Sequence, residues 1–286
     1  MSMKDLCKLD LKTSIKIVRK MIRFSEMNHI LPGSFAVVDE GGHLIVFESR
    51  DGRLTATVDI AIDKAWTAAT MKASGRILEV ITRGQGWRLN VKHKGRLTII
   101  PGTVPIICER RVIGGIGHSG GSAEEDLLIA QAGLAALYDG EEAPPLYDGR
   151  EVKGFGIEFA RMIASKAIEY ILDRGYPHAS IAVVDRWGEL IALYRMDEAP
   201  PGTLELARDK AWTSAVFRVY SEDVVKYGCP KLPDYGLKPV NWNERLTPIP
   251  GGVPIKMGGE VVGGLGIASI SPDIDKLTAL KAIEEV

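Results

Sequence analysis

Apolar residues recur at helical spacing in two segments at matching places in the two halves of the chain, residues 11–28 and 157–174. Residues three or four apart lie on one face of an α-helix, so each segment predicts an amphipathic helix. Residues 54–73 and 204–219 are rich in alanine and are also predicted to be helical. The apolar positions of the first pair are Ile15, Val18 and Ile22, and Phe159, Ile163, Ala167 and Ile171.

Each amphipathic segment is followed by two apolar runs around a polar turn, FAVVDEGGHLIVFE in the first half and IAVVDRWGELIALYR in the second. Two more short runs flank a turn at residues 104–122 and again at 253–271. This pattern predicts β-hairpins. A helix is expected to begin after the second hairpin. Its start is marked by Ser122, which has Glu125 three residues on as in a capping box, and by Ser271, which precedes Pro272.

The two halves repeat one sequence pattern. AVVD occurs at residues 36–39 and 182–185, and DKAWT at 63–67 and 209–213, each time at an offset of 146 residues. Pro101 and Pro250, before the second hairpin, differ by 149, so the second copy has gained three residues. A repeat of this length predicts two domains. We place them at residues 1–140 and 155–286, joined by a polar, proline-containing linker at 141–154.

The predicted order in each copy is helix, two strands, helix, loop, three strands, helix. Residues 97–102 and 246–251 lead into the second hairpin and supply the fifth strand. The loop of the first copy, residues 74–96, is predicted to be helical and then irregular, and residues 221–245 are predicted to be mostly loop because they contain three prolines. The predicted class is α+β, with two tandem modules, each a five-stranded antiparallel sheet flanked by helices.

Composition excludes several classes of protein. The 286 residues carry a net charge of −1, whereas nucleic-acid or anionic-membrane binding requires a basic excess. No apolar run approaches the roughly 20 residues that cross a bilayer, and the charged start MSMKDLCKLDLK argues against a secretion signal. Cys7, Cys108 and Cys229 lack the paired spacing of a zinc site or a disulfide scaffold. These features favour a cytoplasmic protein.

The turn after the second hairpin of the first copy is the best candidate for a ligand site. His118, Ser119, Gly120 and Gly121 lead into the first turn of the predicted helix, where free backbone N–H groups attract a carboxylate or phosphate. His118 is a candidate acid, base or metal ligand, or else a residue of the sheet surface or of a subunit contact. The second copy has Ile267 in its place.

Two formal motifs overlap this turn. GIGHSG at residues 115–120 matches a dinucleotide-binding fingerprint, and GHSGG at 117–121 matches a nucleophile elbow. Both require a parallel sheet, whereas the strand here closes a hairpin. We favour the structural interpretation, in which Gly114, Gly115 and Gly117 permit close backbone packing.

Lys64 and Lys210 occupy identical places in the two DKAWT segments. Such a lysine presents its ammonium either to an anionic ligand or to solvent. The tryptophans two residues further on are expected to fill the core or an interface. Asp39 and Asp185, which precede turns, are expected to bind local backbone.

Several motifs in the same order resemble the GlcG/HbpS-like family of haem-associated proteins. They are AVVD-x-x-G-x-L, RMD at residues 195–197, DKAWTA and PGGVPI…GEVVGGLG. The resemblance covers nearly all of both copies and extends to the PduO C-terminal-like module of the cobalamin pathway. It implies a profilin-like fold, symmetric homo-oligomers and a ligand connected with haem or corrinoids. The first copy keeps the family's SGG at 119–121 but lacks RMD, whereas the second keeps RMD and has SIS at 269–271.

Haem as a cofactor follows from this resemblance alone. The chain offers six candidate axial ligands, none at a spacing that requires iron. They are His29, His43, His93, His118, His178 and Met196. No cluster of His, Asp or Glu has the spacing of a metal-ion site, so no metal ion is predicted.

We therefore expect a cytoplasmic, homo-oligomeric protein that binds a haem-like or other small anionic ligand, with no nucleic-acid or membrane partner. The predicted ligand-binding residues are Lys64, His118, Ser119, Gly120, Gly121, Arg195 from the partner module, and Lys210. One alternative is a lyase or isomerase acting on a small organic acid, with His118 as acid or base. Another is an oligomeric scaffold without a ligand.

Overall fold

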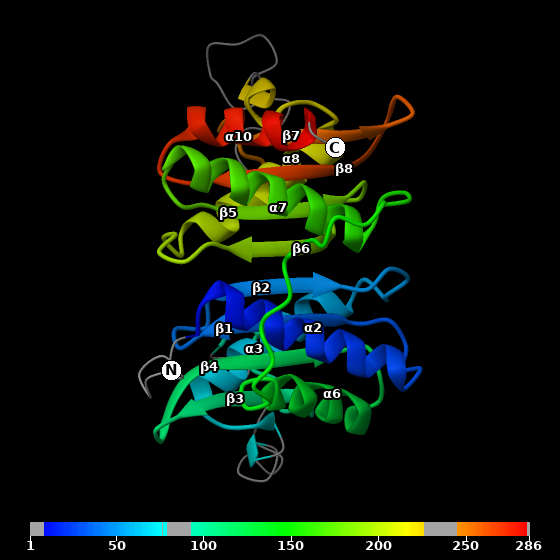
Figure 1. The fold of residues 1–286 in the computed structure, drawn as a ribbon, viewed down its shortest axis with the longest axis vertical. Helices are drawn as coiled ribbons and strands as arrows, with labels where there is room; N and C mark the ends of the chain where they lie inside the picture. Colours follow the sequence, from blue (N-terminus) through cyan, green and yellow to red (C-terminus); the bar gives the residue numbers. More distant parts are fainter. Residues whose placement is uncertain (1–8, 76, 79–92, 226–244, 285–286) are drawn as a thin grey trace. The chain divides into compact units, whose positions relative to one another are not determined.

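The computed structural model describes residues 9–75, 77–78, 93–225 and 245–284. The chain divides into two compact units, residues 1–145 and 146–286, here called the first unit and the second unit. The boundary between them lies inside the segment predicted to be a linker. Figure 1 labels the helices and strands of both units.

The first unit is built on a sheet with the strand order β3-β4-β1-β2, in which every neighbouring pair is antiparallel. Ala36 of β1 lies opposite Phe47 of β2 on one side and Gly117 of β4 on the other. The elements are α2 (Leu11–Met27), β1 (Ser34–Asp39), β2 (Leu44–Ser49), α3 (Thr57–Met71), β3 (Thr103–Cys108), β4 (Arg111–Ser119) and α6 (Ala123–Ala135).

The second unit repeats this arrangement with the strand order β7-β8-β5-β6, again antiparallel throughout. Ala182 of β5 lies opposite Leu193 and Gly266, as Ala36 does opposite its two partners. The elements are α7 (Ile157–Arg174), β5 (Ser180–Asp185), β6 (Leu190–Arg195), α8 (Thr203–Phe217), the 3-10 helix η1 (Ser221–Val224), β7 (Gly252–Met257), β8 (Glu260–Ala268) and α10 (Pro272–Glu284).

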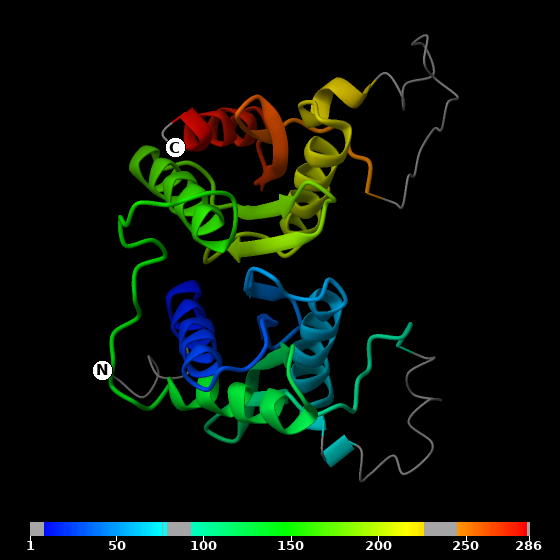
Figure 2. The same ribbon diagram turned by 90° about the vertical axis from the view of Figure 1, so that its right-hand side faces the viewer.

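Helices cover both faces of each sheet (Figure 2). In the first unit α3 packs on one face, and α2 and α6 pack on the other and against each other. In the second unit α8 takes the place of α3, and α7 and α10 cover the opposite face. Within the described ranges, no helix combines the length and the hydropathy needed to cross a membrane.

The predicted α+β class, with two tandem modules of helices on an antiparallel sheet, is confirmed. The structure differs in the number of strands, since the described part of each unit has four rather than five. The segments predicted as the fifth strand, residues 97–102 and 246–251, are irregular because their backbone bonds to a helix side chain. Thr98 N donates to Thr67 Oγ1 at 3.0 Å, and Thr247 N donates to Thr213 Oγ1 at 3.1 Å.

The two connecting segments for which a helix or a loop was predicted lie only partly within the described residues. In the first, residues 76 and 79–92 lie outside the described residues, and in the second residues 226–244 do. The described beginning of the second segment is the 3-10 helix η1 rather than loop. In the first segment Leu78 N donates to Ser74 O at 3.0 Å, as in the predicted helix, and residues 93–96 are irregular as predicted. The predictions for the residues outside the described ranges stay untested.

Glycines on β4 let α3 pack directly against the strand. A Cβ on Gly117 would lie 2.0 Å from the carbonyl oxygen of Ala61, and one on Gly115 would lie 2.3 Å from that of Ala65. Gly266 of β8 would meet Ala207 of α8 at the same 2.0 Å. Any side chain at these positions would push the helix away from the sheet. The predicted role of these glycines in close packing is confirmed.

Cys108, at the end of β3, is disulfide-bonded. The wide sequence spacing of the three cysteines did not predict a disulfide. Spacing identifies local disulfide frameworks, but residues far apart in sequence meet in ways that only the fold determines. The argument from cysteine spacing for a reducing compartment is correspondingly weaker.

Candidate functional site

The lysine of the first DKAWT segment is buried and joins three elements. Lys64, on α3, donates from Nζ to the backbone oxygen of His118 on β4 at 2.8 Å and to Oδ2 of Asp126 on α6 at 2.6 Å. Its side chain is 1% exposed. Burial lowers the pKa of Lys64, and the Asp126 carboxylate opposes this shift. The ammonium therefore holds β4 and α6 onto α3.

The second unit contains the same connection. Lys210 Nζ donates to the backbone oxygen of Ile267 at 2.9 Å and to Asp275 Oδ2 at 2.8 Å, and burial lowers the pKa of Lys210 as well. Sequence reasoning missed both aspartates. The signal was present, because Asp126 and Asp275 differ by the offset of 149 residues that relates Pro101 to Pro250.

The rest of the first DKAWT segment also contacts the protein itself. Arg96 Nε donates to Asp63 Oδ1 at 3.0 Å, and its guanidinium lies 4.7 Å from the centre of the Trp66 ring. Trp66 packs against the turn after β1, where a Cβ on Gly42 would lie 2.5 Å from its Cδ1. The repeated pentapeptide thus ties α3 to its surroundings at successive residues, which explains why both copies contain it.

The turns that follow β1 and β5 are held by the predicted aspartates. Asp39 Oδ1 accepts from the backbone N–H groups of Gly41 and His43, at 2.9 and 3.0 Å. Asp185 Oδ1 accepts from those of Trp187 and Glu189 at the same two distances. The predicted local backbone role of both aspartates is confirmed.

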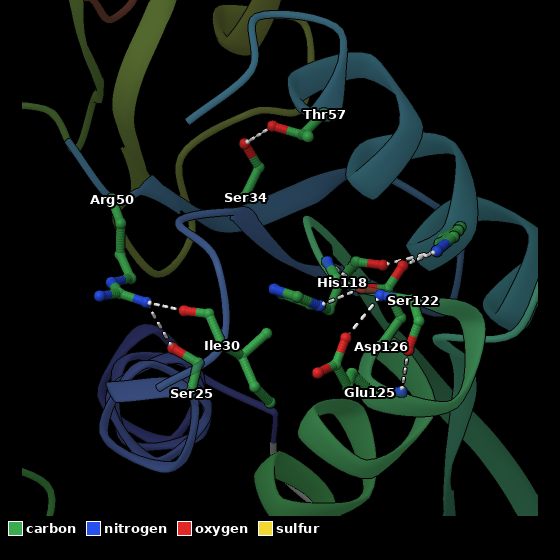
Figure 3. A network of polar contacts seen from close by, with 11 residues as sticks. Ser25, Ile30, Ser34, Arg50, Thr57, His118, Ser122, Glu125 and Asp126 are labelled. Atoms are coloured by element: carbon green, nitrogen blue, oxygen red, sulfur yellow. Dashed lines mark hydrogen bonds and ion pairs between the residues drawn. The ribbon is translucent and has the colours of Figure 1, made fainter. Parts of the chain in front are cut away.

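His118 lies at the end of β4, on the face that α2 and α6 cover, and its side chain is 0% exposed (Figure 3). Its Nδ1 is 2.9 Å from Asp126 Oδ1, although the ring N–H is not aligned as in a regular hydrogen bond. The ring packs at 4.6 Å, centre to centre, on Phe35 of β1. Its Nε2 has no hydrogen-bond partner among the described residues.

This surrounding keeps the imidazole neutral. Burial lowers the pKa of His118 below its ordinary value; the contact with Asp126 opposes the shift, and the charges of Lys64 and Arg50 add to it. Burial by itself would raise the pKa of Asp126, but the contacts with His118 and Lys64 outweigh it, and the pKa is lowered. The site at neutral pH is therefore a neutral ring beside a paired carboxylate and ammonium.

The segment between α2 and β1 covers Nε2 of His118. A Cβ on Gly33 would lie 2.7 Å from that nitrogen and 2.4 Å from the backbone oxygen of Ser119. Arg50 holds this segment, because its backbone N–H donates to Gly33 O at 2.9 Å and its Nη1 donates to Ile30 O at 3.0 Å (Figure 3). Only a glycine fits between the ring and the chain at this place.

The start of α6 is closed by the protein's own acceptors. Ser122 Oγ accepts from Glu125 N at 3.3 Å, and Glu125 Oε2 accepts from Ser122 N at 2.7 Å, which confirms the predicted capping box (Figure 3). Gly121 N donates to Asp126 Oδ1 at 2.9 Å. Three of the N–H groups at this helix start, those of Gly121, Ser122 and Glu125, thus already bind carboxylate or hydroxyl oxygens.

The structure brings most of the predicted site residues together around Asp126. Lys64, His118 and Gly121 contact it, and Ser119 and Gly120 continue from His118 along the segment that faces Gly33. Lys210 belongs to the equivalent arrangement of the second unit, and Arg195 ends β6 of that unit. The offset of 149 also pairs Gly120 with Ser269 of the second unit.

The other candidate haem ligands are distributed over both units. His29 and His43 are exposed, and His43 Nδ1 lies 3.2 Å from Asp39 Oδ1. The ring of His93 packs near Trp66, His178 Nδ1 contacts the backbone oxygen of Asp197, and Met196 is buried. A search of the described residues finds no group of three or more His, Cys, Asp or Glu side chains arranged to hold a metal ion.

Fold and site together define a tandem duplication of a small α+β module with a buried lysine–aspartate pair in each copy. The chain belongs to the HbpS-like family, described as haem degrading protein HbpS-like, whose model matches residues 9–135 and 155–284. The family predicted from the motif order is thereby confirmed.

Relatives match single units of the chain. An uncharacterized 15.0 kDa protein from the dhaT-dhaS intergenic region of Citrobacter freundii is 32% identical over 106 residues, 36% of this chain and 75% of that protein. Protein GlcG of Escherichia coli K12 is 33% identical over 89 residues, 31% of this chain and 63% of GlcG. A crystal structure described as a PduOC:heme complex is 24% identical with a TM-score of 0.43, over 47% of this chain and 96% of that one.

Proposed function

We propose that the chain is a small-molecule-binding protein whose first unit takes a haem-like ligand at His118. Membership of a family described as haem-degrading supports the class of ligand. The observation that carries the proposal is the buried imidazole, which faces a carboxylate through Nδ1 and has an Nε2 without a hydrogen-bond partner among the described residues. A buried polar atom without a partner is uncommon and calls for a role.

The donor set around His118 fits haem iron. Histidines that bind metals typically direct their other ring nitrogen to a carboxylate or carbonyl, which fixes the ring and leaves one lone pair for the metal. The lowered pKa of His118 keeps that lone pair available at neutral pH. Bound haem would supply an iron centre for ligand exchange and redox chemistry.

The other predicted residues support His118 in different ways. Lys64 acts as a positioning residue, because it fixes both Asp126 and the backbone of His118. Gly121 fixes the same carboxylate, and Ser119 and Gly120 leave room for Gly33 next to the ring. Entry of a ligand requires the segment that holds Gly33 to move away from Nε2. Ligand binding by Arg195 or Lys210 stays a prediction.

Titration of the purified protein with haem tests this proposal. The wild type should develop a saturable, shifted Soret band, and His118→Ile, which introduces the residue of the second unit, should lose the shift without any fall in its Tm. The matched control adds the reciprocal change Ile267→His to His118→Ile, and this double variant should not restore the shifted band. An unshifted spectrum of the wild type, or an unchanged shift in His118→Ile, would contradict iron binding at His118.

The same pair of His118 and Asp126 supports a second candidate, the lyase or isomerase acting on a small organic acid. A neutral imidazole oriented by a carboxylate is suited to act as a general base. Exchange of the hydrogen next to the carboxylate for deuterium, followed by NMR over a panel of hydroxy acids and dicarboxylates, detects this chemistry. Exchange that persists in His118→Ile would exclude this residue as the base.

The cytoplasmic location and the homo-oligomer stay proposals. Cell fractionation and light scattering of the purified protein test them directly. A monomer at micromolar concentration would exclude the predicted assembly. Recovery from an extracytoplasmic fraction would exclude the predicted compartment and would agree with the disulfide at Cys108.

A further inference from the structure

We propose that Arg50 is the residue of the first unit that binds a carboxylate group of the ligand. This inference rests on the proposed function for the location of the site, next to His118, but not on the binding of iron. It assigns to Arg50 the anion-binding role that the sequence alone suggested for Lys64 and Lys210.

The two lysines are buried and already bound to partners in their own units. Lys64 and Lys210 are 1% and 0% exposed, and each ammonium donates to an aspartate and to a backbone oxygen of its own unit. A ligand carboxylate would have to break a buried ion pair to reach either one, which is costly. A cation with weaker partners would bind a ligand carboxylate at His118 at a lower cost.

Arg50 is suited to exchange its present partners for a ligand. Its Nη1 donates to two neutral oxygens, Ile30 O at 3.0 Å and Ser25 Oγ at 3.3 Å (Figure 3). Its Nε is 3.6 Å from a carboxylate oxygen of Glu26, whose side chain is 54% exposed. A guanidinium binds a carboxylate through two parallel bonds more strongly than it binds neutral oxygens. An exposed ion pair such as that with Glu26 contributes little.

Arg50 also influences the imidazole and its cover. Its charge contributes to the lowered pKa of His118, and it fixes the segment between α2 and β1 that covers Nε2. A carboxylate that takes the place of Ile30 O on Arg50 would release this segment. Binding of the anionic group and uncovering of His118 would then be one event.

The second unit lacks all three components together. The repeat places Met196 at the position of Arg50, Ala179 at that of Gly33, and Ile267 at that of His118. The guanidinium, the glycine that fits against the ring and the ring itself are thus present in one unit and replaced in the other. Residues that hold the helices onto the sheet, such as the lysine and its aspartate, are the same in both.

The surface beside Arg50 indicates an apolar body for the ligand. Met27 and Leu31 are 68% and 69% exposed, and each directly follows a residue that Arg50 contacts, Glu26 or Ile30. Exposed apolar side chains next to a cation suit a molecule that has an apolar part and a carboxylate. A tetrapyrrole with its acidic side chains belongs to this class.

Fluorescence titration with metal-free protoporphyrin IX and with its dimethyl ester tests the role of Arg50 without iron. The wild type should bind the diacid about 10- to 100-fold more tightly than the ester, since only the diacid offers a charge-assisted pair. Arg50→Met, which introduces the residue of the second unit, should bind both forms equally. Because it also lacks the bond to Ile30 O, it should bind the ester at least as tightly as the wild type does. Arg53→Gln, a nearby arginine on the same loop, should keep the full preference.

Arg50→Gln serves as a second variant in case the methionine variant folds poorly, because glutamine retains a donor for Ile30 O. Equal binding of diacid and ester by the wild type, binding of neither, or a preference that survives in both Arg50 variants would overturn the proposal. A preference for the diacid that depends on Arg50, together with an unshifted haem spectrum, would exclude iron binding by His118 and leave the role of Arg50 intact.

Discussion

The two units hold the same buried lysine–aspartate pair but complete it differently. In the first unit Asp126 Oδ1 receives the N–H of Gly121 and contacts the ring of His118. In the second, Asp275 Oδ1 receives both the N–H and the hydroxyl of Ser269, at 2.9 and 2.6 Å. In the second unit a serine six residues before the aspartate thus gives this oxygen two hydrogen bonds. In the first unit the oxygen has the N–H of Gly121 and lies beside an imidazole ring.

This difference separates the residues that build the module from those that give it a function. Groups present in both units, such as the lysine, the aspartate and the glycines of the last strand, hold helices onto the sheet. Groups present in one unit are the candidates for ligand binding. Internal duplication therefore supplies a comparison within a single chain, and each substitution has a counterpart in the other unit.

The largest effect on stability should come from substitution of the lysines, and it should be equal in the two units. Lys64→Met and Lys210→Met each leave a buried aspartate without its cation, so each should lower the free energy of unfolding of its unit by about 3–5 kcal/mol. Scanning calorimetry of the single variants measures this. Addition of Asp126→Leu to Lys64→Met should recover much of the loss. A large loss of stability in one unit only would contradict the interpretation that the lysine–aspartate pair has the same structural role in both units.

An intermediate effect should come from His118 and should depend on pH. Because the pKa of His118 is lowered in the folded state from its ordinary 6.5, the unfolded chain takes up the proton first as the pH falls below about 6.5, and the stability of the first unit decreases there. His118→Ile should remove this loss. It should also raise the free energy of unfolding by about 1–3 kcal/mol, because it removes a buried nitrogen without a partner. The Tm measured between pH 8 and pH 5 tests both statements.

Ile267→His sharpens this test, because it should give the second unit the acid sensitivity that the first one loses. Parallel Tm-versus-pH curves for the wild type and His118→Ile would show that another group is responsible for the acid sensitivity.

The smallest effect should come from the helix caps. Ser122→Ala removes the hydroxyl that accepts from Glu125 N, and it should lower the free energy of unfolding by about 1 kcal/mol. Ser271→Ala should cost less, since Ser271 contributes its backbone N–H to Ser269 Oγ, a bond that alanine retains. Urea unfolding curves of the two variants measure the difference. A larger loss for Ser271→Ala would mean that its hydroxyl has a role the first unit does not share.

The elements that the sequence predicted well depend on local physics. Helical spacing of apolar residues, alternation around the turn aspartates and the Ser122–Glu125 box each involve residues close in sequence. The close packing through Gly115 and Gly117 was also predictable, because glycine weakens a strand and commonly marks a place where another backbone approaches closely.

The parts that were missed depend on long-range contacts. Asp126 lies among Glu124 and Glu125 in the first turn of α6, where acidic residues are common, so nothing in its surroundings marked it as buried. Lysines are seldom buried, and only the tertiary partner explains Lys64. The prediction of a fifth strand was wrong because the backbone N–H of Thr98 donates to the hydroxyl of Thr67, about 30 residues away, instead of to a neighbouring strand.

The reach of Lys64 has a mechanical consequence. The lysine starts on the helix of one face of the sheet and ends on the helix of the opposite face, passing the end of β4 on its way. If either helical layer detached, Lys64 and Asp126 would separate, and the one left in the core would be a buried charge without a partner. Each unit should therefore melt as a single block, with hydrogen exchange at the start of α6 as slow as that at the centre of α3.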